Sequence, residues 1–348
     1  MRILVTGASG FAGSLLAPRL LSGGHEIVAL ARDPARVDVE RLLSTIPEGP
    51  EGARRGATRG CGREMEVLAA DALTGEGLAR ALHGVEVAYY LIHSMEAPGR
   101  AAARQAHGPV PFPERERIAA ENFASAASHA GVRRVVYLGG PVASWSATPT
   151  RAASSRHLAS REAVEHILRA AIPDTVVLRA SIVIGARSRS FRFLVRLVER
   201  MPVLALPAWR SYRTRPIDAR DVIEMLAAAA TVDAVAARSL DVGGPDILSY
   251  REMIERIAES MLVARPAVGL SVSVTPLVAR VAAAIAEEDP ELTTALMESL
   301  QGDLLPGGVN GRAHLRAAEL LGVELHSFDS AVEHALREWE EAEPLAAR

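Results

Sequence analysis

A glycine-rich turn near the amino terminus restricts the fold of this chain more than any other segment. Residues 3–5 (Ile-Leu-Val) lead directly into the run Thr6-Gly7-Ala8-Ser9-Gly10-Phe11-Ala12-Gly13, and leucines at helical spacing follow it. A second apolar run, residues 27–31, ends at Arg32. A strand, a glycine turn, a helix and a strand in this order predict a βαβ unit whose first turn holds the phosphates of a dinucleotide.

The three glycines of this turn have separate expected roles. Gly7 allows the tight turn out of the strand, Gly10 lets a pyrophosphate approach the backbone, and Gly13 lets the helix lie close to the sheet. The N–H groups at the start of the helix, with its partial positive charge, then face the phosphates. Three glycines alone also occur in ordinary turns, but a preceding strand and a following helix are the context of a dinucleotide site.

Size, charge and cysteine content limit the class of protein. With 348 residues the chain can bury a full core, and its net charge of −3 offers no basic excess for nucleic acid or an anionic membrane. The most apolar late stretch, residues 268–286, is interrupted by Pro276 and Arg280, so we expect no membrane span. The single cysteine, Cys61, and the absence of space for a signal peptide favour a cytoplasmic protein.

The chain contains no lysine, and all 39 of its basic residues are arginine. A coding bias that also enriches Ala, Gly and Pro explains this composition. Whatever its origin, the composition excludes every mechanism that needs a lysine side chain.

The spacing Gly-x-x-Gly-x-x-Gly after Thr6 resembles the short-chain dehydrogenase/reductase superfamily, in its extended or atypical branches. This resemblance implies a Rossmann-type, doubly wound parallel α/β sheet that binds a nicotinamide dinucleotide. We therefore expect a dinucleotide-binding domain over residues 1–185. A smaller carboxyl-terminal α/β lobe, residues 186–348, is expected to carry the substrate site and to be interleaved with the last strands of the sheet.

The end of the second strand bears on the choice between NAD and NADP. NAD-preferring folds place an acid there for the ribose hydroxyls, whereas an arginine holds a 2′-phosphate. The family pattern puts that acid at Ala31, while Arg32 and Arg36 offer two guanidinium groups suited to phosphate. Asp33 follows Arg32 directly and could favour NAD, but it lies beyond the position of that acid. We expect NADP, with NAD or a solvated arginine loop as the alternatives.

Further cofactor contacts are expected where later strands end. The strand 65–70 ends at Asp71, which contacts adenine in the families it resembles or else caps the helix predicted over residues 74–82. The strand 85–92 ends beside His93, so this end is expected near the nicotinamide ribose. The predicted cofactor residues are Gly7, Ser9, Gly10, Phe11, Ala12, Gly13, Arg32, Arg36, Asp71, Ala72, Leu91, His93 and Arg161.

The catalytic residues of the superfamily are replaced in this chain. Catalytic relatives carry Tyr-x-x-x-Lys on a helix that continues to a glutamate, and the lysine lowers the tyrosine pKa for proton transfer. Counted back from Glu165, Arg161 stands at the lysine position and His157 at the tyrosine position. His157 can donate a proton near neutral pH, and Arg161 can hold the ribose. These two are the candidate catalytic residues, and the alternative is a protein that binds cofactor without turnover.

Longer motifs bring the resemblance closer to the atypical group. This group includes NmrA-like NADP-binding regulators and the accessory NADPH-binding subunit of respiratory complex I, and loss of the Tyr/Lys pair is expected in it. The resemblance implies cofactor binding more firmly than turnover, so both a redox sensor or assembly factor and a reductase or isomerase remain open. The motifs are Ala88-Tyr-Tyr-Leu-Ile-His-Ser-Met95, Val136-Tyr-Leu-Gly-Gly140 and Leu178-Arg-Ala-Ser-Ile-Val-Ile-Gly185.

Periodicity predicts the elements between these motifs. A helix over residues 114–130 carries Ile118, Phe123 and Ala126 on one face, and residues 175–185 form a sixth strand.

In the second half, Trp209, Arg213 and Arg215 form an arginine/aromatic cluster. It is either a pocket for an anionic small molecule or a solvated loop whose arginines pair with Asp218 and Asp221. The sequence shows no metal-ligand cluster, and it is compatible with an oligomer.

Overall fold

The computed structural model describes residues 1–44, 65–93, 110–142, 145, 155–269, 302–306 and 311–342. Cys61 and most of the late apolar stretch lie outside these residues. Within them, no helix is long and apolar enough to cross a membrane.

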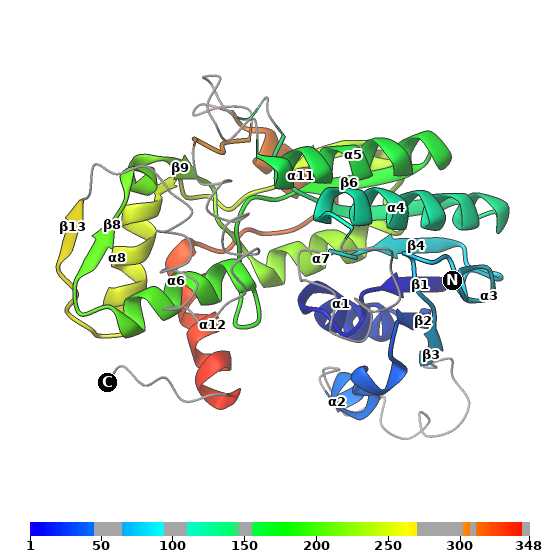
Figure 1. Cartoon of the computed structure of the whole chain (residues 1–348), viewed down its shortest axis with the longest axis horizontal. Coiled ribbons are helices and arrows are strands. Elements are labelled where there is room, and N and C mark those ends of the chain that lie inside the picture. The colour runs from blue at the N-terminus through cyan, green and yellow to red at the C-terminus, as the bar shows by residue number, and fades with distance from the viewer. Residues whose placement is uncertain are drawn as a thin grey trace.

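Seven of the described strands form a central sheet (Figure 1) in the order β11-β6-β5-β4-β1-β2-β3. Every neighbouring pair in it is parallel. The strand order reverses between β1 and β4, which is where doubly wound sheets bind ligands. The predicted doubly wound α/β fold is confirmed. The strands are β1 (Arg2–Thr6), β2 (Glu26–Ala31), β3 (Met65–Ala69), β4 (Val87–Tyr90), β5 (Arg134–Gly139), β6 (Thr175–Arg179) and β11 (Ser239–Asp241).

Helices cover both faces of the sheet, and each face has its own apolar core. On one face α1 (Phe11–Ser22), α7 (Ala219–Ala229) and α11 (Ala313–Leu321) pack on alternate sheet residues such as Ile3 and Val5. On the other face α3 (Leu78–Ala81), α4 (Phe112–His129) and α5 (Arg156–Ala171) pack on the intervening residues, such as Leu4. Because side chains alternate across a strand, fully buried strands read as continuous apolar runs.

A third apolar core lies in a lobe at the far end of the molecule from β3 (Figure 1). Helices α6 (Arg189–Arg200), α8 (Tyr250–Ser260) and α12 (Phe328–Ala342) build it around Phe191, Tyr250 and Trp339. The domain boundary at residue 185 stays a prediction. The remaining short elements are η1 (Pro34–Arg36), α2 (Val39–Ser44), β7 (Val183–Ile184), β8 (Leu204–Leu206), η6 (Ala208–Ser211), β9 (Arg213–Thr214), β10 (Ile217–Asp218), η7 (Asp233–Val235), β12 (Leu248–Ser249) and β13 (Ala267–Gly269).

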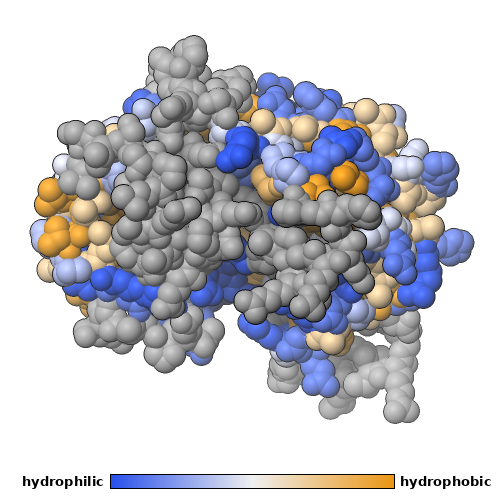
Figure 2. Space-filling view, viewed as in Figure 1, coloured by the Kyte–Doolittle hydropathy of each residue, from blue (hydrophilic) through white to orange (hydrophobic). Residues whose placement is uncertain are grey.

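The surface of this lobe carries exposed apolar side chains. Figure 2 shows them gathered at its outer end, over β8 and β13. The large exposed apolar residues of the lobe are Val203, Leu262 and Val268.

Two predicted elements differ from the structure. The helix over 74–82 is shortened to α3, because Gly75 and Gly77 adopt positive φ angles of 81° and 78° and hold the preceding residues in a turn. The strand over 175–185 is interrupted: β6 stays in the central sheet, and β7 pairs with β10 in a separate two-stranded sheet. The Ser181 hydroxyl donates to the Arg215 carbonyl at 3.0 Å and holds the chain in the bend between them.

The closest approach between α1 and the turn before it occurs at Gly13. A Cβ at this position would lie 2.3 Å from the Gly7 carbonyl oxygen and 2.9 Å from Ala8 Cα. Both are backbone atoms, so they cannot move aside as a flexible side chain would. Glycine at position 13 is therefore a steric requirement of this helix position.

We predict that Gly13→Ala lowers the free energy of unfolding by about 1–3 kcal/mol, because the added methyl overlaps backbone. Chemical denaturation measures the change. The matched control is Gly140→Ala, where the nearest atom to an added Cβ is Arg161 Cγ at 3.4 Å, an ordinary contact. An equal loss of stability in both variants would contradict the steric explanation.

Candidate active site

The turn between β1 and α1 forms a compact backbone cradle. Gly7 adopts φ +64°, and the Gly10 N–H donates to the Gly7 carbonyl at 2.8 Å. Ser9 and Gly10 are exposed at the tip. Gly10 is the N-cap of α1 and provides no side-chain acceptor, so the first-turn N–H groups at Phe11 and Ala12 are available to an anion.

The cradle is tied to the end of β4. The Thr6 hydroxyl accepts a hydrogen bond from the Leu91 N–H at 2.8 Å. A Cβ at Gly7 would lie 3.1 Å from the Leu91 carbonyl oxygen. The turn and the segment that leads to His93 are thus held side by side at the carboxyl edge of the sheet.

Two exposed arginines follow the end of β2, together with an aspartate that is already hydrogen-bonded within its own turn. Arg32 and Arg36 are exposed, and neither side chain has a hydrogen-bond or ion-pair partner among the described residues. Asp33 caps η1, because its Oδ1 accepts from the Ala35 N–H at 3.1 Å. The acid nearest to the expected ribose position is therefore used in a local turn.

The loop after β3 is held by its own carboxylate and by α4. Asp71 Oδ1 accepts from the Leu73 N–H at 2.8 Å, so Asp71 closes a turn and does not cap α3. The Asn122 side-chain amide donates to the carbonyls of Ala72 and Leu73 at 2.9 and 3.0 Å. Asn122 is a positioning residue that the sequence reasoning missed.

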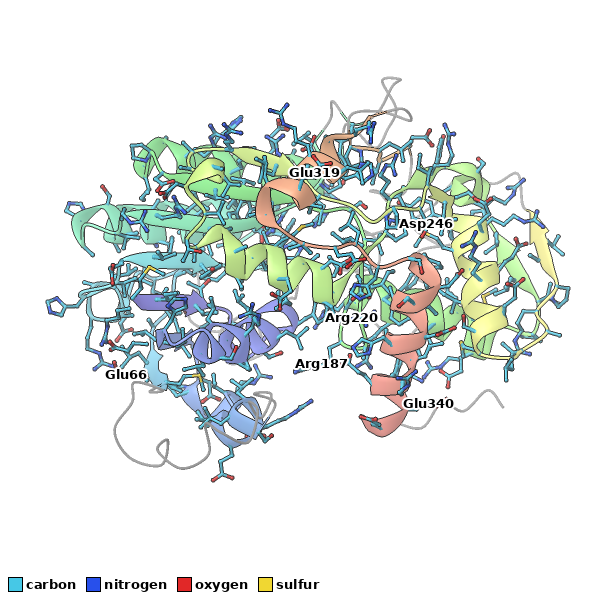
Figure 3. The ribbon with its side chains drawn as sticks, turned by 180° about the vertical axis from the view of Figure 1, so that it is seen from behind. Glu66, Arg187, Arg220, Asp246, Glu319 and Glu340 are labelled. Atoms are coloured by element: carbon cyan, nitrogen blue, oxygen red, sulfur yellow. The ribbon has the colours of Figure 1, made fainter. Side chains whose placement is uncertain are left out.

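The loop after β7 reaches the same region from the other lobe. Arg187 Nη1 donates to the Ser14 hydroxyl of α1 at 3.1 Å, and Figure 3 shows this side chain beside α1. A Cβ at Gly185 would lie 2.9 Å from the Phe11 ring. Burial and the nearby Arg41 and Arg192 lower the pKa of Arg187. Sequence reasoning missed Arg187, because its contact with α1 spans 173 positions.

At the ends of β4 and α5, two histidines and a carboxylate form a chain of contacts. His157 Nε2 lies 3.1 Å from His93 Nε2, and His93 Nδ1 lies 2.9 Å from Glu116 Oε1. The Ser160 hydroxyl donates to the other Glu116 oxygen at 3.2 Å. Glu116 is only 2% exposed. The structure therefore joins the two histidines singled out in the sequence and adds Glu116, which the sequence reasoning missed.

Arg161 occupies the base of this group and is buried. Its guanidinium donates to the carbonyl of Leu138 at the end of β5 and lies 3.5 Å from that of Ile92 after β4. The same group stacks over the Tyr137 ring, 4.8 Å from its centroid. Arg161 thus links the ends of two strands directly beneath the histidines.

The family of the chain follows from a match to a known family model. Residues 3–243 match the model of the NAD dependent epimerase/dehydratase family. The chain belongs to this family. The extended branch of the superfamily that the glycine spacing resembles is thereby confirmed, while the NmrA-like and complex I-like subtypes stay predictions.

Curated relatives match only in part. A dihydroflavonol 4-reductase of Zea mays is 39% identical over 71 residues, which make up 17% of this chain and 20% of the maize protein. A 3-beta-hydroxysteroid dehydrogenase of Mycolicibacterium neoaurum is 26% identical over 136 residues, 39% of this chain and 31% of that protein. The chain thus aligns with less than a third of the length of either relative.

Solved structures are similar over the whole chain. A UDP-glucuronic acid 4-epimerase of Bacillus cereus in complex with NAD has a TM-score of 0.65 at 16% identity, covering 98% of this chain and 97% of its own. A dTDP-glucose 4,6-dehydratase of Streptomyces venezuelae with NAD has a TM-score of 0.66 at 18% identity, covering 99% and 98%. At these identities the likeness establishes the fold.

In this family member the histidines lie in an electropositive setting. Burial, the neighbouring His93 and the Arg161 guanidinium lower the pKa of His157 to about 3. Burial and Arg161 also lower the pKa of His93, which the Glu116 hydrogen bond raises in part. Both imidazoles are therefore neutral at physiological pH. Among the described residues, no group of three His, Cys, Asp or Glu side chains is suited to a metal ion.

The arginine/aromatic cluster of the second half is divided among several partners. Trp209 is buried against Tyr250, with ring centroids 5.9 Å apart. Arg213 forms an ion pair with Asp303 at 2.9 Å. It does not pair with Asp218 or Asp221, the partners considered from the sequence. Arg215 is buried, donates to the Pro245 carbonyl at 3.2 Å, and keeps an Nε without a described partner.

We predict that the stability of the protein falls as the pH is lowered from about 7, in part because of His157. The unfolded imidazole binds a proton near pH 6.5, whereas the folded one does so only near pH 3. Acid therefore favours the unfolded state throughout this interval. His157→Phe should make the decline of the urea midpoint between pH 7 and pH 4 shallower than in the wild type. Identical declines would show that this imidazole is not held neutral.

Proposed function

We propose that the chain binds NADP(H) in the crevice at the carboxyl ends of β1, β2 and β4. The backbone cradle at Gly7, Gly10 and Gly13 would hold the pyrophosphate, and the strand end at Leu91 and His93 would border the nicotinamide ribose. Asp71 and Ala72 would border the adenine. The observation that carries the proposal is the exposed guanidinium pair at the end of β2, beside the backbone cradle that precedes α1.

The preference for NADP rests on charge at one position. The structural relatives hold NAD, and NAD binding normally uses an acid for the ribose hydroxyls. Here Ala31 ends β2, Asp33 is engaged in capping η1, and Arg32 and Arg36 carry no described counterion. A 2′-phosphate supplies the missing negative charge, since guanidinium groups bind phosphate with paired hydrogen bonds.

We predict that Arg32→Ala weakens NADPH binding by about 10- to 100-fold, the effect of losing one or two charged hydrogen bonds. NADH binding should change by less than about threefold, because NADH lacks the 2′-phosphate. Fluorescence titration with both cofactors measures this. The matched control is Arg80→Ala, which removes an exposed arginine from α3. Equal losses for NADPH and NADH would contradict the assignment of the 2′-phosphate site.

A second function, turnover of a small carbonyl or hydroxyl substrate, is favoured by the contact chain from Glu116 to His157. Glu116 accepts a hydrogen bond from the Ser160 hydroxyl through one oxygen, and as a carboxylate it would accept His93 Nδ1–H through the other. His93 Nε2 is then an acceptor and takes the Nε2–H of His157. This arrangement makes Nδ1 of His157 the basic nitrogen of the group.

In an oxidation, Nδ1 of the neutral His157 would take the hydroxyl proton of the substrate as the C=O bond forms; its low pKa makes it a weak base, so the step depends on the onward transfer to His93. A bound nicotinamide would supply the hydride acceptor. The new imidazolium would pass its Nε2 proton toward His93, where the Glu116 carboxylate offsets the positive charge. Reduction of a carbonyl runs the same steps in reverse. The group would thus replace the missing tyrosine. Arg161 would hold the strand ends and the ribose, and Arg215 is the candidate to meet an anionic substrate group.

We predict that His157→Phe abolishes hydride transfer in a substrate screen. Glu116→Gln should lower kcat about 10- to 1,000-fold, while NADPH affinity stays within about threefold of the wild type. The matched control for Glu116 is Glu121→Gln, an exposed carboxylate on the same helix that pairs with Arg117. Turnover that survives both site changes would contradict the relay. NADPH binding with no turnover in the wild type would instead support the sensor or assembly role implied by the atypical group.

A further inference from the structure

A second cavity lies away from the proposed cofactor crevice, along the free edge of the central sheet. It has a volume of about 470 Å³. Edge strand β11 forms its floor, and the ends of α5 and β6 line one side. Helix α11, marked by Glu319 in Figure 3, forms the other side. We call this space the edge cavity. None of the residues assigned to the cofactor or to catalysis lines it.

Four arginines from four different segments line the edge cavity: Arg169, Arg179, Arg238 and Arg316. Arg179 forms an ion pair with Glu165, to which it donates two hydrogen bonds of 2.9 and 2.6 Å. Asp241, the acid in the lining, lies 3.5 Å from the same guanidinium. Both carboxylates interact with Arg179, and Glu165 also accepts the Ser239 hydroxyl at 2.6 Å and lies near the Arg169 charge.

None of the other three guanidinium groups forms a direct hydrogen bond or ion pair with a carboxylate in the described part of the chain, although Arg169 lies near Glu165. Arg169 donates to neutral acceptors, the Ser239 hydroxyl and the Ala237 carbonyl. Arg238 and Arg316 have no described acceptor. Like charges that converge on one cavity repel each other, so an anion placed between them gains more than it would from a single exposed arginine.

The backbone beside the cavity is held in an unfavourable conformation. Ala237 adopts φ +56°, in the left-handed region that residues with a Cβ rarely adopt. Its N–H donates to Asp174 at 3.2 Å, and its carbonyl accepts from Arg169. Ala237 directly precedes Arg238 and accepts from Arg169. The unfavourable conformation therefore lies at the residue that positions these two cavity arginines.

Apart from Ser239, the remaining lining is apolar. Leu240 lies on the floor, and Ala313, Ala317 and Leu320 lie on α11 together with Arg316. A cavity that combines guanidinium groups with aliphatic side chains suits a small organic molecule with a charged end.

From this arrangement we infer that the edge cavity binds a phosphate-bearing small molecule. Its phosphate would be held by Arg169, Arg238 and Arg316, and its carbon skeleton would lie against α11. Phosphate fits better than a single carboxylate, because guanidinium forks of three separate arginines can each meet a different oxygen pair.

The test is isothermal titration with inorganic pyrophosphate on the full chain without cofactor, fitted to two classes of site because the cradle before α1 is itself proposed to hold a pyrophosphate. In the double variant R238A/R316A one of the two classes should bind pyrophosphate at least about tenfold more weakly than in the wild type. R80A/R337A removes two exposed arginines elsewhere and should leave the affinity unchanged. R32A/R36A removes the proposed 2′-phosphate contacts. Adding R238A/R316A to this variant should weaken pyrophosphate binding by the same factor as adding it to the wild type.

Each outcome is decisive for the edge cavity. Wild-type affinity in R238A/R316A, or an equal loss in R80A/R337A, would overturn the inference. Binding that disappears in R32A/R36A alone would place pyrophosphate at the cofactor crevice and would also overturn it. Failure of NADPH to bind at all leaves the result for the edge cavity readable, because no step of this titration uses the cofactor.

Discussion

The position of α1 against the turn that precedes it governs the rest of this structure. The Gly7 carbonyl occupies the space of a Cβ at Gly13, so the helix can approach the end of β1 at this separation only with glycine. That approach fixes where the first N–H groups of α1 point, and hence where an anion is stabilised. The second lobe contacts the same helix at two places. Gly185 packs against the Phe11 ring, and Arg187 donates a hydrogen bond to Ser14.

Helix α5 depends on a different interaction, the burial of Arg161 beneath the strand ends. A lysine there would present one compact charge, whereas the planar guanidinium reaches two backbone carbonyls and stacks on Tyr137. The same positive charge disfavours protonation of both neighbouring histidines. An arginine at this position is therefore consistent with neutral imidazoles at His93 and His157.

Local signals in the sequence were enough for the parallel sheet and for placing the glycine turn, Arg161 and His157 at its carboxyl edge, while their roles in cofactor binding and catalysis stay predictions. Each depends on spacing within one or two adjacent elements, such as the four-residue interval that puts Arg161 and Glu165 on the same helix face. Asn122 and Arg187 depend on contacts between distant segments, and no local pattern marks them. For Asp71 the sequence located the residue correctly at the end of β3 but not its hydrogen-bond partner. An acid in a loop after a strand has several possible local partners, and here it accepts from the Leu73 N–H.

Glu116 shows most clearly why part of the site is absent from the sequence pattern. The apolar periodicity assigned Ile118, Phe123 and Ala126 to the inner face of α4, but the buried side chains include Glu116, Ala120 and Phe123. Burial of Glu116 on this face is favourable because Ser160 and His93 form hydrogen bonds with its carboxylate, since a buried carboxylate without hydrogen bonds costs several kcal/mol. Those partners come from α5 and from the segment after β4. The carboxylate is therefore acceptable only once α4, α5 and the segment after β4 have packed together, so the contacts that join Glu116 to His157 depend on the assembled fold.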